Sequence, residues 1–325
     1  MRPEAQNSRT HAHPRQLSQV RRIVTPVTRR GWLLFITLGV FWGIPYLFIR
    51  IAVTELDPVV VAFGRTMLGA LLLLPFALRA KALRPILARW RWLLVYTCVE
   101  IVLPWVLLGH AEIRLTSSTT GLLIAMVPIV AAIILTVTGQ DRLGPRRVAG
   151  LLLGLAGVGL LVGLDLRFDD LVAVLQVLGV VIGYAIGPII ISRQLADLPS
   201  IGGITTSLVL AAVVYLPFAI WLRPEHVSAQ ALGSVVVLAV VCTAGAFMVM
   251  FALIAEAGPA RMTLITYVNP AVAVLLGALV LDEPITLGLV LGFPLIILGS
   301  ILGTWRSAAP PEDPVHPGQA IAERT

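Results

Sequence analysis

The chain has 325 residues, of which 58% are hydrophobic and only 13% charged, and its mean hydropathy is +0.94. Soluble domains average about 45–50% apolar and about 25% charged residues, so this composition excludes an enzyme built on one soluble core. A single anchor would not raise the mean so far, whereas ten spans of about 20 residues would take roughly two-thirds of the length. We therefore expect an all-α integral membrane protein.

The chain begins with a polar, arginine-rich stretch, residues 1–30, which lacks the apolar core of a signal peptide and predicts a disordered basic cytoplasmic leader. Residues 306–325 predict a short cytoplasmic tail. Ten apolar segments lie between them, at 31–53, 58–78, 92–110, 117–138, 146–163, 171–192, 201–222, 231–254, 260–281 and 286–305. The connections are too short for a soluble domain, so ten transmembrane helices are predicted.

The basic residues divide unevenly between the two sides of such a bundle. With the N-terminus inside, nineteen of the 24 Lys and Arg fall in cytoplasmic segments, and the outer loops hold three, Arg114, Arg167 and Arg223. Cytoplasmic loops are enriched in Lys and Arg, so both termini are predicted to be cytoplasmic in a multi-pass protein of the cell membrane. Contact with membrane lipids explains the basic surplus, and no nucleic-acid partner is expected.

The second half of the chain repeats the first at an offset of 142 residues. The matched pairs include Pro128 with Pro270, Asp141 with Glu283, Gly150 with Gly292 and Gly157 with Gly299. Five spans separate the copies, and an odd number turns the second copy upside down. This predicts two inverted five-helix repeats, 31–163 and 171–305, an architecture typical of secondary transporters. Duplication for packing alone is the alternative.

Three stretches resemble the drug/metabolite transporter superfamily and, within it, the EamA-type ten-helix carriers. WGIPYLFIR resembles the first-helix pattern of Trp-Gly followed by a basic residue, here Arg50 where Lys is usual. Pro58 with Arg65 resembles the Pro and Arg pair of the second helix. GPARMTLITYVNPAVAVLLGALVLDEPIT, residues 258–286, resembles the signature that ends in an acid, and the first-half copy departs from it with Asp141 instead of Glu. The resemblance covers residues 31–305 and implies export, without identifying a substrate.

Ionisable residues inside the spans are functional candidates, because a charge near a helix centre costs about 2.5–3.5 kcal/mol on insertion scales. Glu100 lies midway along the third span and predicts a proton-binding carboxylate or a partner for a substrate amine. A buried ion pair with Arg65 is the alternative. Arg65 is expected to have a paired role in the cavity, whereas Arg50 predicts an anchor at the membrane interface.

Aromatic residues and prolines complete the predicted substrate and ion site. Pro128 and Pro270 are expected to break their helices, so that freed carbonyl groups contact substrate. Tyr184, which lies 142 residues after Trp42, is expected to share one pocket with it. The predicted lining is Trp42, Tyr46, Arg65, Glu100, Trp105, Pro128, Tyr184, Tyr267, Asn269 and Pro270. Packing aromatics and simple kinks are the alternative for each of them.

These features predict a secondary active transporter, and not an enzyme. It would move a small metabolite or drug-like molecule by alternating access, as an exporter driven by an ion gradient or by exchange, with no cofactor or metal. The chain has no nucleotide-binding or zinc-hydrolase motif. The competing hypothesis is a polytopic membrane enzyme that acts on lipid-linked phosphates through Asp165, Asp169 and Asp170.

Glycines are frequent in the fifth and tenth predicted spans, for example Gly150, Gly154 and Gly157, and Gly292 with Gly299. Small residues at this spacing let helix backbones approach closely. They predict helix packing within the chain, with a homodimer face as the alternative. The two cysteines, Cys98 and Cys242, lie inside apolar runs and are interpreted as small core residues.

Overall fold

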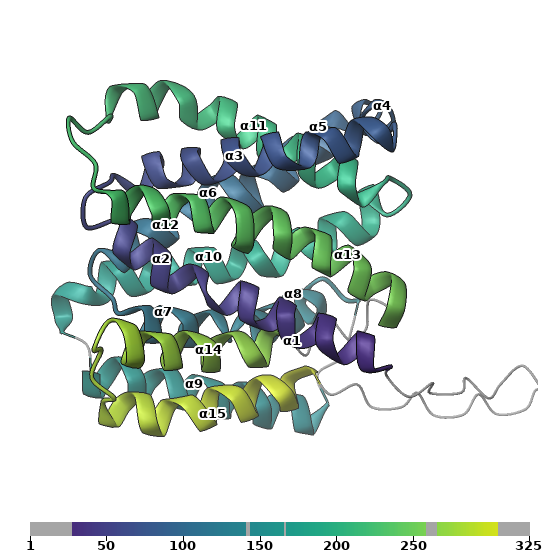
Figure 1. The fold of residues 1–325 in the computed structure, drawn as a ribbon. Coiled ribbons are helices and arrows are strands. Elements are labelled where there is room, and N and C mark those ends of the chain that lie inside the picture. Colours follow the sequence, from purple (N-terminus) through teal and green to yellow (C-terminus); the bar gives the residue numbers. More distant parts are fainter. Residues whose placement is uncertain (1–27, 141–143, 166, 258–264, 305–325) are drawn as a thin grey trace, which may run out of the picture.

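The computed structural model describes residues 28–140, 144–165, 167–257 and 265–304, and all regular structure in these ranges is helical. Figure 1 shows the helices lying roughly side by side as one bundle. Its α-helices are α1 (Arg29–Gly43), α2 (Pro45–Ala52), α3 (Pro58–Arg79), α4 (Leu83–Leu87), α5 (Trp90–Thr97), α6 (Leu103–Glu112), α7 (Ser117–Ile124), α8 (Val127–Val137), α9 (Pro145–Asp165), α10 (Leu171–Ile190), α11 (Ser200–Trp221), α12 (Ala229–Ala239), α13 (Ala246–Ala257), α14 (Ile265–Val280) and α15 (Leu287–Thr304). Short π-helices are η2 (Cys98–Val102), η4 (Ile191–Leu195) and η5 (Val240–Gly245), and η3 (Phe168–Asp170) is a 3-10 turn.

Eight helical stretches among the described residues are long and apolar enough to cross a membrane. They are Arg29–Ala52, Pro58–Arg79, Trp90–Glu112, Ser117–Val137, Pro145–Asp165, Phe168–Leu195, Ser200–Trp221 and Ala229–Glu256. Two shorter apolar helices follow, Ile265–Val280 and Leu287–Gly303. The prediction of an all-helical membrane protein is confirmed. The predicted leader and tail lie outside the described residues.

Helix starts in this bundle are set by capping side chains and by proline. Asp57 accepts a hydrogen bond from the Val59 amide at 2.8 Å, and Pro58 is the first residue of α3. Ser228 caps α12 by accepting from the Ala231 amide at 3.1 Å. Such caps satisfy amides that have no partner inside the helix, and proline fits the first helical turn, where its missing N–H is not needed.

The repeat predicted from the sequence recurs in the helix boundaries. α3 and α11 are both 22 residues long and begin at Pro58 and Ser200, which are 142 positions apart. The π-helices η2 and η5 begin at Cys98 and Val240, again 142 apart. α3 packs against α11, its counterpart, and α9 packs against α15. Each copy therefore places its second helix and its fifth helix against the equivalent helix of the other.

The glycines of α9 and α15 face each other inside one chain. A Cβ added to Gly299 would lie 2.5 Å from the Gly154 nitrogen and 2.6 Å from the Gly150 oxygen. Only glycine allows two backbones to come so close, which is the packing role predicted for these residues. The homodimer stays a prediction.

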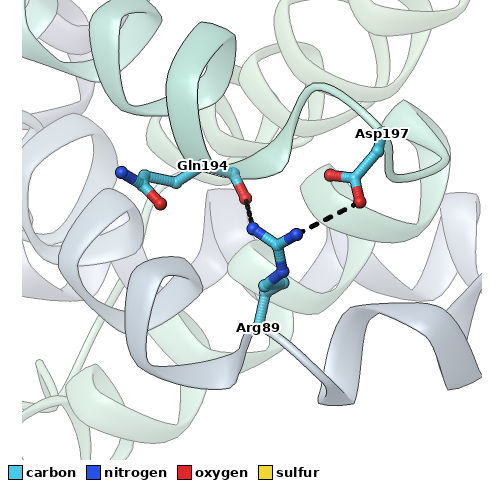
Figure 2. Close-up of polar contacts among 3 residues, drawn as sticks. All are labelled: Arg89, Gln194 and Asp197. Carbon is cyan, nitrogen blue, oxygen red and sulfur yellow. Dashed lines mark hydrogen bonds and ion pairs between the residues drawn. The ribbon is translucent and has the colours of Figure 1, made fainter.

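The two ends of the bundle carry different connections. The start of α1, the end of α15 and the short helix α4 lie at the same end, on the right in Figure 1, and the turn between α14 and α15 lies at the opposite end. Figure 2 shows Arg89 joining the start of α5 to the segment after α10: its Nη1 donates to the Gln194 carbonyl oxygen at 2.9 Å, and its Nη2 lies 3.3 Å from an Asp197 carboxylate oxygen. Because both side chains are largely exposed, this pair contributes little to stability.

Candidate functional site

Arg65 is a buried cation in α3 with only 7% of its surface exposed. Its Nε donates to the Thr243 hydroxyl of η5 at 2.8 Å, and its guanidinium carbon lies 3.8 Å from the ring centroid of Trp105. Its Nη2 is 3.5 Å from the Cys242 carbonyl oxygen. Arg65 is therefore held by neutral groups and an aromatic face, which attracts cations. The alternative that paired Arg65 with Glu100 is not realised among the described residues.

Glu100 lies in the π-helical turn η2, inside the third candidate span. Its Oε2 atom is buried and has no hydrogen-bond partner in the protein. The carboxylate lies against Gly187 of α10, because a Cβ added at Gly187 would overlap that oxygen. Gly187 thus makes the room for Glu100, a role that the sequence analysis did not identify.

The π-helical turn also leaves backbone carbonyl groups free to accept hydrogen bonds from other helices. The Tyr215 hydroxyl of α11 donates to the Val102 oxygen at 2.8 Å and lies 3.2 Å from the Ile101 oxygen. In η5, the equivalent turn of the second copy, the Cys242 oxygen faces Arg65. Both turns therefore contact the counterpart helices α11 and α3, and each sits beside one of the two ionisable candidates.

Two tyrosines connect these charged residues. Tyr46 of α2 is 5% exposed and lies within electrostatic range of Arg65 and Tyr184. Tyr184 of α10 lies within electrostatic range of both Arg65 and Glu100, and it packs against two hydrophobic clusters of the bundle. The structure therefore brings together five predicted residues, which we call the polar core: Tyr46, Arg65, Glu100, Trp105 and Tyr184.

The remaining predicted aromatic and amide residues make contacts with neighbouring helices. Trp42 packs edge-to-face on Phe247, with ring centroids 6.4 Å apart. The Tyr267 hydroxyl donates to the Ser300 carbonyl oxygen of α15 at 3.2 Å. With the Asn269 amide oriented so that its nitrogen faces the surrounding carbonyl oxygens, this nitrogen lies 3.1 Å from the Gly39 oxygen of α1. A pocket shared by Trp42, Tyr184, Tyr267 and Asn269 stays a prediction.

The two repeat prolines differ in their local structure. Pro128 is the second residue of α8 and follows a break after α7, where the Ser300 hydroxyl donates to the Ala125 carbonyl oxygen at 2.8 Å. Pro270 lies inside α14, which continues from Ile265 to Val280. The helix break predicted at Pro270 is therefore not observed. Neighbouring helices allow transmembrane segments to keep a proline in the interior.

The sequence analysis missed Glu112, the last residue of α6. Its side chain is 0% exposed, and neither carboxylate oxygen has a hydrogen-bond partner. The Arg50 guanidinium lies next to it but donates from Nη1 to the backbone oxygens of Glu112 and Ile113, the latter at 2.9 Å. Ending the third span at residue 110 placed Glu112 in a loop. The acid two residues beyond that boundary was the available signal.

Two other carboxylates, in contrast to Glu112, accept hydrogen bonds from the starts of helices. Glu283 accepts hydrogen bonds from the Ser117 and Ser118 amides of α7 at 2.7 and 3.0 Å, and from the Ser118 hydroxyl at 2.5 Å. Asp165 accepts from the Thr286 hydroxyl and from the Gly288 amide, the latter at 3.0 Å, at the start of α15. Asp141, the repeat partner of Glu283, lies outside the described residues.

The three aspartates of the enzyme hypothesis do not act as one group. Asp165 is used at the start of α15, and Asp170 accepts a hydrogen bond from the Arg167 amide at 3.0 Å. No group of three or more His, Cys, Asp or Glu side chains in the described part of the chain is arranged to hold a metal ion. Asp165 and Asp170 therefore serve local structure.

Comparisons with known proteins decide the family. The sequence model of the EamA-like transporter family matches residues 29–163 and again 171–305. The chain belongs to the EamA-like transporter family. It is 26% identical to the uncharacterized transporter YvbV of Bacillus subtilis over 292 residues, which cover 87% of this chain and 94% of that protein. An uncharacterized transporter of Archaeoglobus fulgidus is 21% identical over 280 residues, or 83% and 97% of the two chains.

The fold is shared with a solved crystal structure that is 19% identical in sequence. The match has a TM-score of 0.61 and covers 84% of this chain and 96% of the other. Within this EamA-like protein, both family copies contribute to the polar core. The first copy supplies Tyr46, Arg65, Glu100 and Trp105, and the second supplies Tyr184 together with Thr243, the partner of Arg65.

Proposed function

We propose that this EamA-like protein is a secondary active exporter of small amphipathic molecules that works by alternating access between two inverted repeats. The observation that carries the proposal is the polar core, in which Tyr184 of the second family copy lies within electrostatic range of both Arg65 and the unpartnered Glu100 of the first copy. Substrate and ion sites of inverted-repeat transporters form at such a repeat interface.

The proposed topology has ten crossings with both termini in the cytoplasm. α14 and α15 have 16 and 18 residues, which at 1.5 Å per residue is about 24–27 Å, close to the hydrocarbon thickness of about 30 Å. Both described chain ends lie at one end of the bundle, as an even number of crossings requires. If that end faces the cytoplasm, most Lys and Arg residues lie on the cytoplasmic side, as the positive-inside rule expects.

The polar core suggests a division of roles. Trp105 and the two tyrosines offer aromatic surface to the apolar part of a substrate, and Arg65 offers a positive charge that neutral partners leave uncompensated. The buried Oε2 atom of Glu100 has no hydrogen-bond partner, so we assign to this carboxyl group the binding and release of a proton during the cycle. Surrounding lipids and a small-molecule substrate are the only partners that this mechanism requires.

Transport of labelled candidate compounds by the purified protein in proteoliposomes, with and without an imposed pH gradient, tests the proposal. We expect at least one compound to accumulate against its gradient when the pH gradient is present. Glu100→Gln keeps the shape of the side chain but removes its titration, so it should abolish this accumulation and leave exchange partly intact. Glu225→Gln, at an exposed glutamate, is the matched control. Full accumulation by Glu100→Gln would show that the carboxylate is structural.

A further inference from the structure

Glu112 combines complete burial with a lack of partners. It ends the third candidate span, its side chain is 0% exposed, and both carboxylate oxygens lack a hydrogen-bond donor. A buried carboxylate that is ionised is normally paired or hydrogen-bonded, because the interior does not replace the water that it loses. Glu112 therefore either carries a proton or holds a cation. It lies twelve residues after Glu100, about 18 Å along a helix, so the two are separate sites.

Among the described residues, no ion pair to the Glu112 carboxylate is observed. The neighbouring cation, Arg50, donates from Nη1 to the backbone oxygens of Glu112 and Ile113 instead. Glu283 adds a negative charge within electrostatic range, from the turn after α14. In the described part of the chain, the titratable groups of other elements within electrostatic range of Glu112 include Arg50 and Tyr46 of α2, Arg65 of α3, Tyr184 of α10, and Glu283. Arg50 and Arg65 attract a negative charge at Glu112 and Glu283 repels it, so it is the complete burial of the carboxyl group that opposes ionisation.

We propose that Glu112 is a second ion-coupling residue, which binds a proton from the external side and carries it while its side chain is buried, as it is in this structure. On release, the O–H bond of the carboxyl group breaks and the proton passes to water at the opened end. Arg50 then pairs with the ionised carboxylate, because its side chain can rotate the guanidinium away from the neighbouring carbonyl oxygens. The coupling role rests on the proposed transport function, whereas the protonation does not.

Infrared spectroscopy of the protein in lipid membranes tests the protonation directly, because a protonated carboxyl group absorbs apart from an ionised one. We expect Glu112→Gln to remove one carboxylic acid band at neutral pH in sodium-free buffer, and Glu225→Gln to remove none. An unchanged band pattern in Glu112→Gln would overturn the proposal. A band that disappears from the wild type on addition of sodium chloride would also overturn it, in favour of a sodium site. If Glu112→Gln does not fold, Glu112→Asp should shift the same band, and an unshifted band contradicts protonation.

Transport separates this inference from the proposed function. For the compound that the wild type accumulates most strongly, Glu112→Gln should lower accumulation driven by the pH gradient by about tenfold or more and keep exchange within about twofold. Unchanged accumulation would overturn the coupling role of Glu112. If the wild type moves no compound although its carboxylic acid band depends on Glu112, the proposed transport function fails and the protonation stands.

Discussion

The carboxylates of the third span and those at the helix starts have opposite surroundings. Glu100 and Glu112 have buried oxygens without donors. Glu283 receives three hydrogen bonds from the start of α7, and Asp165 receives two at the start of α15. An acid at a helix start is stabilised by free amides and by the helix dipole, whereas an unpartnered buried acid is a cost to the fold. The difference supports a structural role for the acids at the helix starts and the proposed ion chemistry for the acids of the third span.

The largest stability effect should come from Glu283→Ala. This change removes three hydrogen bonds and leaves the Ser117 and Ser118 amides without their partner, so we expect a loss of about 2–3 kcal/mol in unfolding free energy. Glu112→Ala removes no hydrogen bond from the carboxylate. Denaturation of both variants in the same detergent measures the contrast. Equal losses in the two variants would erase the distinction between the two sets.

Gly187→Ala tests whether Glu100 is pressed against α10. The added methyl group would overlap the Glu100 carboxylate, so one of the two must move, at a cost of about 1–3 kcal/mol. Combining it with Glu100→Ala removes the obstructing group, and the double variant should be more stable than the two single effects predict. Gly203→Ala is the matched control, because a Cβ there has no atom within 4 Å. Additive losses would mean that the Glu100 carboxylate is not what opposes the added methyl group.

The hold on Arg65 can be weakened without touching a carboxylate. Thr243→Val keeps the shape of the side chain but removes the acceptor for Nε, so we expect a loss of about 1–3 kcal/mol in unfolding free energy. The measurement is chemical denaturation of the purified variant. Thr138→Val, at an exposed threonine whose hydroxyl bonds only to residues within four positions along the chain, serves as the control. A negligible loss would mean that Arg65 finds another acceptor.

How far the sequence predicts this molecule depends on which forces act locally. Long apolar runs and the 142-residue offset predicted the helical spans and the related helix starts, because lipid requires internally bonded helices. The position of Glu100 inside a π-helical turn was not predictable, since that turn depends on contacts with α10 and α11. Glu112 escaped notice for a similar reason. Its burial comes from helices distant in sequence, while its own neighbours suggested a loop.

The same limit applies to charge pairing. Depth in the span correctly marked Arg65 as needing a partner, but the partner is a threonine hydroxyl and a tryptophan ring, where an acid was the alternative considered. Conversely, the acid of the repeat signature, Glu283, has its partners at the start of α7, 165 and 166 positions earlier. Residue type indicates that a partner is needed, and only the packing of the spans decides which residue supplies it.

The smallest effect is expected at Glu55, which is exposed and caps the start of α12. Its carboxylate accepts from the Ser228 hydroxyl at 2.7 Å and from the Ser228 amide at 2.9 Å, and these two bonds hold the pKa of Glu55 below its ordinary value of 4.5. A carboxyl group with a lowered pKa in the folded state stabilises the fold above pH 4.5. That contribution is lost as the pH falls from there through the lower folded value.

The apparent melting temperatures of the wild type and Glu55→Gln, compared from about pH 7 to about pH 3, measure this contribution. We expect the wild type to be slightly more stable at neutral pH and the difference to shrink below pH 4.5, where the carboxyl group takes up its proton. Glu225→Gln, which removes an exposed glutamate without these two bonds, should show no such convergence. A difference that stays constant across this range would mean that the amide of glutamine replaces the carboxylate as a cap. The contrast with the third span would then rest on Glu283 and Asp165, whose donors come from the starts of two other helices.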